Sequence, residues 1–174
     1  MNRRTVLQGL AAMVAMPLFS GCSRAANPQP GAGAKAVVGL NKPDAFWRGK
    51  VSPAAYDVLF KDGTERAFSS PLDKEKRAGT YLCSACWLPL FNSAHKFDSG
   101  TGWPSFTQPI AGHMGSKRDF KLILPRTEYH CARCDGHQGH IFNDGPPPRG
   151  ERWCNNGLAL RFAPKGQPLP ALRG

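Results

Sequence analysis

The chain has 174 residues, of which 41% are hydrophobic and 20% are charged, and its formal net charge is +11. This length suits one domain with a hydrophobic core and flanking segments, and it is short for two domains. Lysine and arginine are scattered along the sequence, so the charge indicates a solvated surface and argues against a basic arm that binds nucleic acid. The 19 glycines, 16 prolines and short apolar runs favour a β-rich fold with many turns.

Residues 1–22 are expected to be an export signal. Arg3 and Arg4 form a twin arginine, which is followed by a mostly apolar stretch and then by FSGC, ending at Cys22. The apolar stretch is shorter than the roughly 20 residues that a membrane-spanning helix needs. NRRTVLQ resembles a twin-arginine motif, and FSGC resembles a lipoprotein cleavage box. We therefore expect an exported protein, periplasmic or anchored by a lipid on Cys22, with cleavage a few residues later as the alternative.

Three segments follow the signal. Residues 23–43 are rich in alanine, glycine, proline and asparagine without an apolar period, which predicts a flexible linker. Residues 44–164 contain the expected folded domain, and residues 165–174 are expected to be a tail that frays from about Ala163 onward.

The domain is expected to begin with a short helix. Ser52 has the residue type of a helix N-cap, and Pro53 suits the first helical position. A helix from here places Tyr56, Leu59 and Phe60 on one face. The sequence KDGT that follows is a turn signal.

Strands are expected in the rest of the domain. GTYLCSACWLPL (79–90) reads as a strand that runs into a turn. DFKLILPRTEYHC (119–131) is a strand candidate with an apolar run at 122–124. The final expected strand is RWCNNGLALRF (152–162), in which Leu158, Leu160 and Phe162 alternate as in a half-buried strand.

Four of the six cysteines form two C-x-x-C pairs, Cys83/Cys86 and Cys131/Cys134. Two such turns brought together by a fold suit one tetrahedral zinc ion, and four thiolates leave no open coordination position, which predicts a structural site. Two disulfides are the alternative in an exported protein. A thioredoxin-like redox pair would need a helix in a βαβ context, which the sequence lacks.

Cys154 is left without a structural partner. An odd thiol in an exported protein can be a buried hydrophobe, a partner in an intermolecular disulfide or a reactive nucleophile. The flank of Arg152, Asn155 and Asn156 is polar and cationic, which favours the nucleophile.

Histidines lie between the second cysteine pair and Cys154. In GHQGHIFNDG, His137 and His140 are three residues apart and Asp144 follows. A metal site would need further ligands that are not close in the sequence, and a single histidine is most often a satisfied surface or core residue. The other three histidines, at 95, 113 and 130, are expected to be structural.

Several motifs together resemble one family. They are FDSGTGWPSF, PRTEYHC, CARCDGHQGHIFNDGPPP and RWCNNGLALRF, in this order and with both cysteine pairs. The chain thereby resembles methionine sulfoxide reductase B, the peptide-methionine (R)-S-oxide reductases, from about residue 47 to residue 164. This resemblance implies that residues 44–164 are a catalytic domain of two antiparallel sheets, with a small barrel-like core, a four-cysteine zinc knuckle and short N-terminal helices.

The resemblance also implies the chemistry. Cys154 matches the cysteine that attacks the sulfoxide sulfur, and a cationic neighbourhood of Arg152 and histidines would lower the pKa of this thiol. His137 and His140 match active-site histidines, one of which protonates the sulfoxide oxygen. Asp144 matches the acid that orients the cluster.

The substrate site is implied by two aromatic residues and an amide. Trp103 matches the indole that packs against the ε-methyl group of the substrate, with Phe106 as the second expected substrate-binding residue. Asn156 matches an active-site position and is expected to orient neighbouring groups.

The reaction would leave a sulfenic acid on Cys154. Many family members have a resolving cysteine where this chain reads Ser99-Gly100-Thr101. We therefore expect an external thiol reductant, oxidised periplasmic or envelope proteins as substrates and no nucleic acid as partner. The alternatives are a thiol peroxidase that uses Cys154 and a basic zinc-knuckle module that binds nucleic acid.

Overall fold

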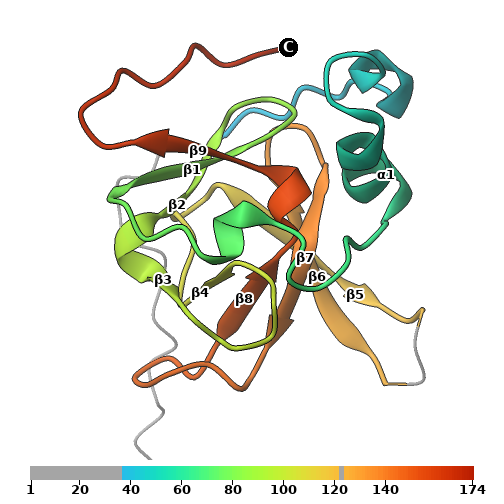
Figure 1. Cartoon of the computed structure of the whole chain (residues 1–174). Helices are drawn as coiled ribbons and strands as arrows, with labels where there is room; N and C mark the ends of the chain where they lie inside the picture. The colour runs from blue at the N-terminus through green and yellow to red at the C-terminus, as the bar shows by residue number, and fades with distance from the viewer. Residues whose placement is uncertain (1–36, 122–123) are drawn as a thin grey trace, which may run out of the picture.

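The computed structural model describes residues 37–121 and 124–174 (Figure 1). The expected export signal at 1–22, the lipid on Cys22 and the linker up to residue 36 lie outside the described residues. Leu122 and Ile123 lie outside them as well. Among the residues that are described, no helix combines the length and the hydropathy needed to cross a membrane.

The strands form two antiparallel sheets, which confirms the expected mainly β fold (Figure 1). The smaller sheet has the order β2-β1-β9 and the larger sheet the order β3-β4-β8-β7-β6-β5. The strands of the smaller sheet are β1 (Gly79–Cys83), β2 (Pro89–Asn92) and β9 (Leu160–Pro164). Those of the larger sheet are β3 (Lys96–Phe97), β4 (Ser105–Phe106), β5 (Met114–Asp119), β6 (Arg126–Cys131), β7 (His137–Phe142) and β8 (Arg152–Asn155).

One α-helix, α1 (Pro53–Lys61), and four 3₁₀ turns complete the described fold. The turns are η1 (Asp44–Trp47), η2 (Pro71–Asp73), η3 (Ser93–His95) and η4 (Gly157–Ala159). The Ser52 hydroxyl caps α1 by accepting a hydrogen bond from the backbone N–H of Ala55 at 3.2 Å, as expected from the sequence. Tyr56 and Leu59 are buried on the helix face that meets the domain.

The core lies where the two sheets face each other. Phe91 of β2 stacks on Phe106 of β4 with ring centroids 4.0 Å apart, and Tyr81 of β1 meets the same phenylalanine edge-on at 5.0 Å. All three side chains are fully buried. Aromatic pairs of this kind contribute stability beyond the area that they bury, so they fix the two sheets against each other.

The expectation of one strand over residues 119–131 is wrong, because β5 ends at Asp119 and β6 begins at Arg126. Asp119 at the end of β5 pairs with Arg126 at the start of β6, so the residues between them connect a hairpin. Phe120 and Leu124 are 72% and 78% exposed. Phe120 and Leu124, the described apolar residues of this connection, therefore do not lie in the core.

The final strand expected over residues 152–162 is also wrong as a single strand. β8 pairs with β4 and β7 in the larger sheet, whereas β9 pairs with β1 in the smaller one. The turn η4 separates them and leaves Leu158 37% exposed. The alternation of apolar residues thus spans a change of sheet, which hydropathy alone does not reveal.

Both ends of the described chain are held on the domain. The backbone N–H of Leu40, in the segment expected to be a linker, donates to the carbonyl oxygen of Arg133 at 2.7 Å. β9 continues to Pro164, and the guanidinium of Arg173 donates to the carbonyl oxygens of Ser84 and Ala85 at 2.7 Å. The C-terminal residues are therefore tied to the first cysteine turn, where a frayed tail was expected.

Candidate functional site

Cys154 lies in the middle of the larger sheet, with a neighbouring strand on each side. It is directly opposite His140 of β7 and Ser105 of β4. Residues opposite each other in antiparallel strands point to the same face of the sheet, with Cβ atoms about 4.5–5.5 Å apart. Strand register therefore puts the thiol and the His140 imidazole side by side. Gly139 allows this pairing, because a Cβ atom there would collide with the carbonyl oxygen of Cys154.

A small pocket of about 120 Å³ opens beside the thiol. Its lining combines an indole, a phenyl ring, an imidazole and a thiol. The lining residues are Thr64, Trp103, Arg126, Gly139, His140, Phe142, Cys154 and Asn156. Its volume is below the roughly 300–1,000 Å³ of typical small-molecule sites, so it suits the end of one side chain.

The pKa of Cys154 differs from the sequence-based expectation. Burial raises the pKa of this thiol above its ordinary value. Arg152 and a hydrogen bond from Thr101 act in the opposite direction, as cations and donors do for a thiolate, but burial outweighs them. The resting group is therefore a thiol at neutral pH, and it needs a base to become a nucleophile.

His140 is held by an acid that the sequence did not single out. Its Nε2 lies 2.8 Å from a carboxylate oxygen of Asp119, and Arg126 donates to the same carboxylate at 2.7 Å. Hydrogen bonds from the Lys121 backbone N–H, His140 and Arg126 hold the pKa of Asp119 well below its usual range. An ionised carboxylate only accepts hydrogen bonds, so Nε2 carries the proton and Nδ1 is the nitrogen that can take up another. Burial lowers the pKa of His140.

His137 stands behind His140, away from the pocket. Its side chain is 3% exposed, its Nδ1 lies 2.9 Å from a carboxylate oxygen of Glu128, and its ring centroid is 5.3 Å from that of His140. Asp62, Glu128 and His137 each offer one possible ligand atom, and these atoms lie within 4.8 Å of one another. However, Lys121 forms an ion pair with Asp62, and Lys117 forms one with Glu128. The extra ligands that a second metal site would need are thus present but already neutralised by lysines.

Asp144 does not orient the histidines, contrary to the expectation. Its carboxylate accepts two hydrogen bonds from the guanidinium of Arg152, at 2.8 and 2.9 Å. This bidentate pair lowers the pKa of Asp144 and raises that of Arg152. The guanidinium also stacks over the Phe142 ring at 4.4 Å. Asp144 therefore positions Arg152, while Asp119 and Glu128 hold the histidines.

Glu65 connects the two walls of the pocket. Its backbone carbonyl accepts from the indole Nε1 of Trp103 at 3.2 Å, and its backbone N–H donates to the side chain of Asn156 at 3.1 Å. Its buried carboxylate accepts from the backbone N–H groups of Gly157 and Leu158. One residue thus fixes an indole and an amide that lie far from it in the sequence.

Phe106 is not at the site, contrary to the expectation. Phe106 pairs with Trp153, whereas the preceding residue, Ser105, pairs with Cys154. Successive residues of a strand point to opposite faces, so Phe106 lies on the face away from the thiol. Its side chain is fully buried between the sheets.

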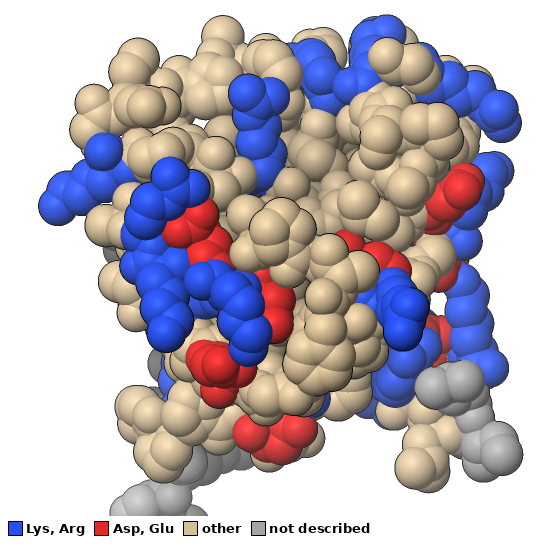
Figure 2. All heavy atoms as spheres, viewed as in Figure 1, with Lys and Arg blue, Asp and Glu red and all other residues tan. Residues whose placement is uncertain are grey.

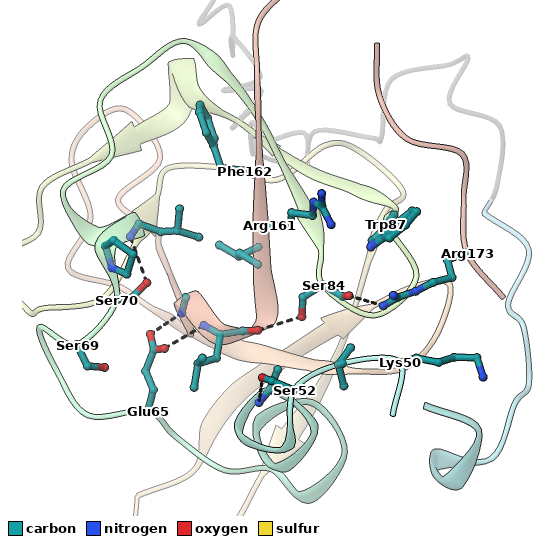
Figure 3. Close-up of a pocket in the computed structure, with 17 residues that line it drawn as sticks. Lys50, Ser52, Glu65, Ser69, Ser70, Ser84, Trp87, Arg161, Phe162 and Arg173 are labelled. Atoms are coloured by element: carbon teal, nitrogen blue, oxygen red, sulfur yellow. Dashed lines mark hydrogen bonds between the residues drawn. The ribbon is translucent and has the colours of Figure 1, made fainter. Parts of the chain in front are cut away.

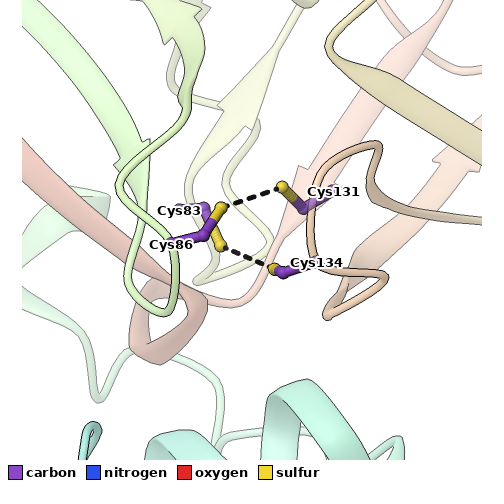
Figure 4. Close-up of side chains that lie close together, drawn as sticks. All are labelled: Cys83, Cys86, Cys131 and Cys134. Atoms are coloured by element: carbon purple, nitrogen blue, oxygen red, sulfur yellow. Dashed lines mark hydrogen bonds between the residues drawn. The ribbon is translucent and has the colours of Figure 1, made fainter. Parts of the chain in front are cut away.

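The two cysteine turns meet with their four side chains facing one another (Figure 4). Cys83 Sγ lies 3.6 Å from Cys134 Sγ, and Cys86 Sγ lies 3.5 Å from Cys131 Sγ. All four sulfur atoms are buried, free and within 4.8 Å of one another. Four ligands at the usual Zn–S distance of about 2.3 Å would have sulfurs about 3.8 Å apart, whereas a disulfide needs about 2.05 Å. The donor set fits one tetrahedral metal ion and does not form the alternative disulfides.

Several residues of the site were not found from the sequence. Glu65, Asp119, Glu128 and Arg126 reach the histidines and the pocket from distant segments. Arg126 and Glu128 had a signal, because both lie in the quoted motif PRTEYHC beside the second cysteine pair.

Comparison with known proteins identifies the family. Residues 51–164 match the model of the SelR domain. A relative from Bradyrhizobium diazoefficiens, named peptide methionine sulfoxide reductase MsrB, is 50% identical over 125 residues, which cover 71% of this chain and 90% of the relative. One of the same name from Pseudomonas putida is 52% identical over 120 residues, 68% of this chain and 90% of the relative. The chloroplastic peptide methionine sulfoxide reductase B1 of Arabidopsis thaliana is 46% identical over 67% of this chain and 58% of its own length. The chain therefore belongs to the SelR domain family, to which its motifs, its two sheets and its paired cysteine turns had pointed.

Proposed function

We propose that this protein is a peptide-methionine (R)-S-oxide reductase that reduces the sulfoxide through the thiol of Cys154. The observation that carries the proposal is the placement of Cys154 opposite His140 in one pocket with Trp103. A thiol, an imidazole and an indole suit a substrate group that must be attacked at sulfur, protonated at oxygen and held at a methyl group.

The reaction balances within this pocket. The Cys154 thiol loses its proton to Nδ1 of His140, and the thiolate attacks the sulfoxide sulfur. The attack forms an S–S bond, and the imidazolium returns a proton to the oxygen. The S–O bond then breaks, the released hydroxide adds to Sγ of Cys154, and the S–S bond breaks with its electron pair leaving on methionine, so that Cys154 becomes a sulfenic acid. The sulfoxide is reduced by two electrons, and the thiol is oxidised by two.

His140, and not His137, is the proposed proton carrier. It lines the pocket and is paired with Cys154, whereas His137 lies behind it with its Nδ1 on Glu128. Asp119 fixes the tautomer of His140, so that Nδ1 is free for the exchange. The role of His137 is to pack against His140 and hold its ring.

The sulfenic acid is proposed to be reduced by an external thiol. Two thiol equivalents would restore Cys154 and release water and a disulfide. Among the described residues, the other cysteines all belong to the buried four-cysteine cluster. The segment Ser99-Gly100-Thr101 stands where many family members have a resolving cysteine, and the Thr101 hydroxyl acts on the Cys154 thiol by a hydrogen bond.

Zinc is the metal proposed for Cys83, Cys86, Cys131 and Cys134. Four thiolates are a typical structural zinc set with no open coordination position, so the ion would cross-link the two turns without entering the reaction. The leader supports a further proposal of export through the twin-arginine route, with lipidation at Cys22. Repair of oxidised periplasmic or envelope proteins is the role that would follow from this location.

The test is single-turnover reduction of the separate R and S isomers of a blocked methionine sulfoxide by reduced, zinc-loaded protein. The expected result is one methionine per chain from the R isomer only, with none from a Cys154→Ser variant. Hydrogen peroxide is the matched second substrate. Rapid consumption of peroxide without reduction of either sulfoxide would contradict the proposal and favour a thiol peroxidase.

A further inference from the structure

A second cavity, larger than the Cys154 pocket, has Glu65 in its wall (Figure 3). Its volume is about 670 Å³, which is within the roughly 300–1,000 Å³ of small-molecule sites. Glu65 and Gly157 are part of its wall, but neither Cys154 nor a histidine lines it. The reductase chemistry therefore leaves this cavity without a role.

Cations outnumber acids among the residues that line this cavity. Lys50, Arg161 and Arg173 line the cavity, and among the described residues that line it Glu65 is the only acid. Both carboxylate oxygens of Glu65 are occupied by the backbone N–H groups of η4. Lys50 and Arg161 form no ion pair with an acid of residues 37–121 or 124–174.

The cavity also has an apolar part. Besides the cations, it is lined by aliphatic and aromatic side chains, which are Val51, Ala55, Pro71, Leu72, Trp87, Leu158, Leu160 and Phe162. Trp87, Arg173 and Lys50 lie on one side of the cavity, and Glu65 and Ser70 lie on the opposite side (Figure 3). A ligand that satisfies this lining has an apolar or aromatic body and one anionic group.

Trp87 supplies an aromatic wall of the cavity. It follows the first cysteine turn with φ 63°, in the left-handed region that favours glycine and that bulky residues rarely adopt. Asp135 has φ 59° at the equivalent place after the second turn, outside the cavity. The indole of Trp87 lies between the guanidinium groups of Arg173 and Arg161, at 4.7 and 5.4 Å. A strained tryptophan stacked by two cations supplies a flat apolar wall beside positive charge.

We propose that this cavity is a second binding site, separate from the Cys154 pocket, for an amphipathic monoanion with an aromatic or apolar body and a carboxylate or sulfonate head. Arg161 receives the anionic group. Trp87 and the apolar side chains receive the body. Binding here does not depend on the reductase activity.

The test is a titration of the zinc-loaded full chain with 2-naphthoate, followed by two-dimensional NMR of the indole N–H groups. The chain has four tryptophans, of which Trp87 lines this cavity and Trp103 lines the Cys154 pocket. We expect a saturable shift of the Trp87 resonance with Trp103 unmoved. The neutral analogue 2-naphthamide should bind about tenfold more weakly, because it lacks the charge that the cations neutralise.

Matched variants separate a binding role from a structural one. Arg161→Gln should weaken 2-naphthoate binding about tenfold and leave the binding of 2-naphthamide unchanged. Trp87→Gly removes the wall at a position where glycine suits the backbone, so binding should be lost without a lower melting temperature. Asp135→Gly makes the same backbone change outside the cavity and should leave binding as it is.

Three outcomes would overturn the proposal. One is a shift at Trp103 in place of Trp87. Another is equal affinity for 2-naphthoate and 2-naphthamide in both the original chain and Arg161→Gln. The third is a Trp87→Gly chain that is less stable but binds 2-naphthoate unchanged, which would make this tryptophan a structural residue only.

Discussion

The Nε2 of His140 lies 2.8 Å from the carboxylate of Asp119, a residue from the hairpin end 21 positions earlier in the chain. Arg126 from the facing strand holds the same carboxylate at 2.7 Å. The histidine beside Cys154 is therefore oriented by a pair that closes the β5–β6 hairpin. The tautomer of His140 therefore depends on the register of the β5–β6 hairpin.

Replacing Asp119 with asparagine should lower kcat about 100-fold, because an amide can also donate and no longer fixes the proton on Nε2 of His140. KM should change little, since Asp119 does not line the pocket. Steady-state kinetics with the R sulfoxide would measure both constants. Asp44→Asn, which changes an exposed acid of η1, is the control. Equal kcat values for the two variants would contradict the role of Asp119.

The pH dependence of the alkylation rate of Cys154 should show a raised pKa for this thiol. Burial raises the pKa above the ordinary value of 9.0, so the rate with iodoacetamide should keep rising with pH beyond 9. Arg152 lowers this pKa, and Arg152→Gln should therefore move the midpoint further up. Mass spectrometry of the Cys154 peptide in a pH series would give the midpoint. A midpoint below 8 in the unmodified chain would show that a neighbouring cation dominates over burial.

Glu65 should be a large contributor to stability. Glu65→Ala leaves the buried backbone N–H groups of Gly157 and Leu158 without acceptors, which should cost about 2–4 kcal/mol of the free energy of unfolding. Urea unfolding would measure the loss. Glu65→Gln keeps one acceptor oxygen and should recover part of it. If alanine and glutamine variants are equally stable, the hydrogen bonds to η4 are not the cause.

The pKa of Glu65 also predicts the direction in which the contribution of this residue to stability changes with pH. Burial raises this pKa above the ordinary value of 4.5, so the folded chain binds the proton more tightly than the unfolded one. Its contribution to stability is therefore greatest at acid pH and is lost as pH rises from about 4.5 through the raised pKa. The difference in unfolding free energy between the original chain and Glu65→Gln, measured across this range, should change in that direction. An unchanged difference would contradict the shift.

Removal of metal should unfold the two cysteine turns together. The four thiols are buried within 4.8 Å of one another, and among the described residues their hydrogen-bond partners are one another, Gln138 and the backbone of Leu88. We expect one zinc per chain by elemental analysis and a lower melting temperature after chelation. Cys86→Ser should have the same effect, whereas Cys154→Ser should keep both the zinc and the melting temperature. Zinc retained by Cys86→Ser at full stability would exclude the proposed site.

The surface charge agrees with the interpretation made from the sequence. In the face shown in Figure 2, lysine and arginine side chains alternate with aspartate and glutamate and do not form one continuous basic strip. Their distribution on this face suits a solvated surface.

The sequence by itself determined the features that depend on local spacing. The two cysteine turns, the lone thiol of Cys154 and the capped helix after Ser52 are each specified by residues a few positions apart. Tertiary structure decided the features that depend on strand register. It placed Phe106 on the face away from the thiol, gave His140 the carboxylate of Asp119, and divided the last strand between two sheets. Register is set by packing between distant segments, and a shift of one residue exchanges the two faces of a strand, so no local pattern could settle these points.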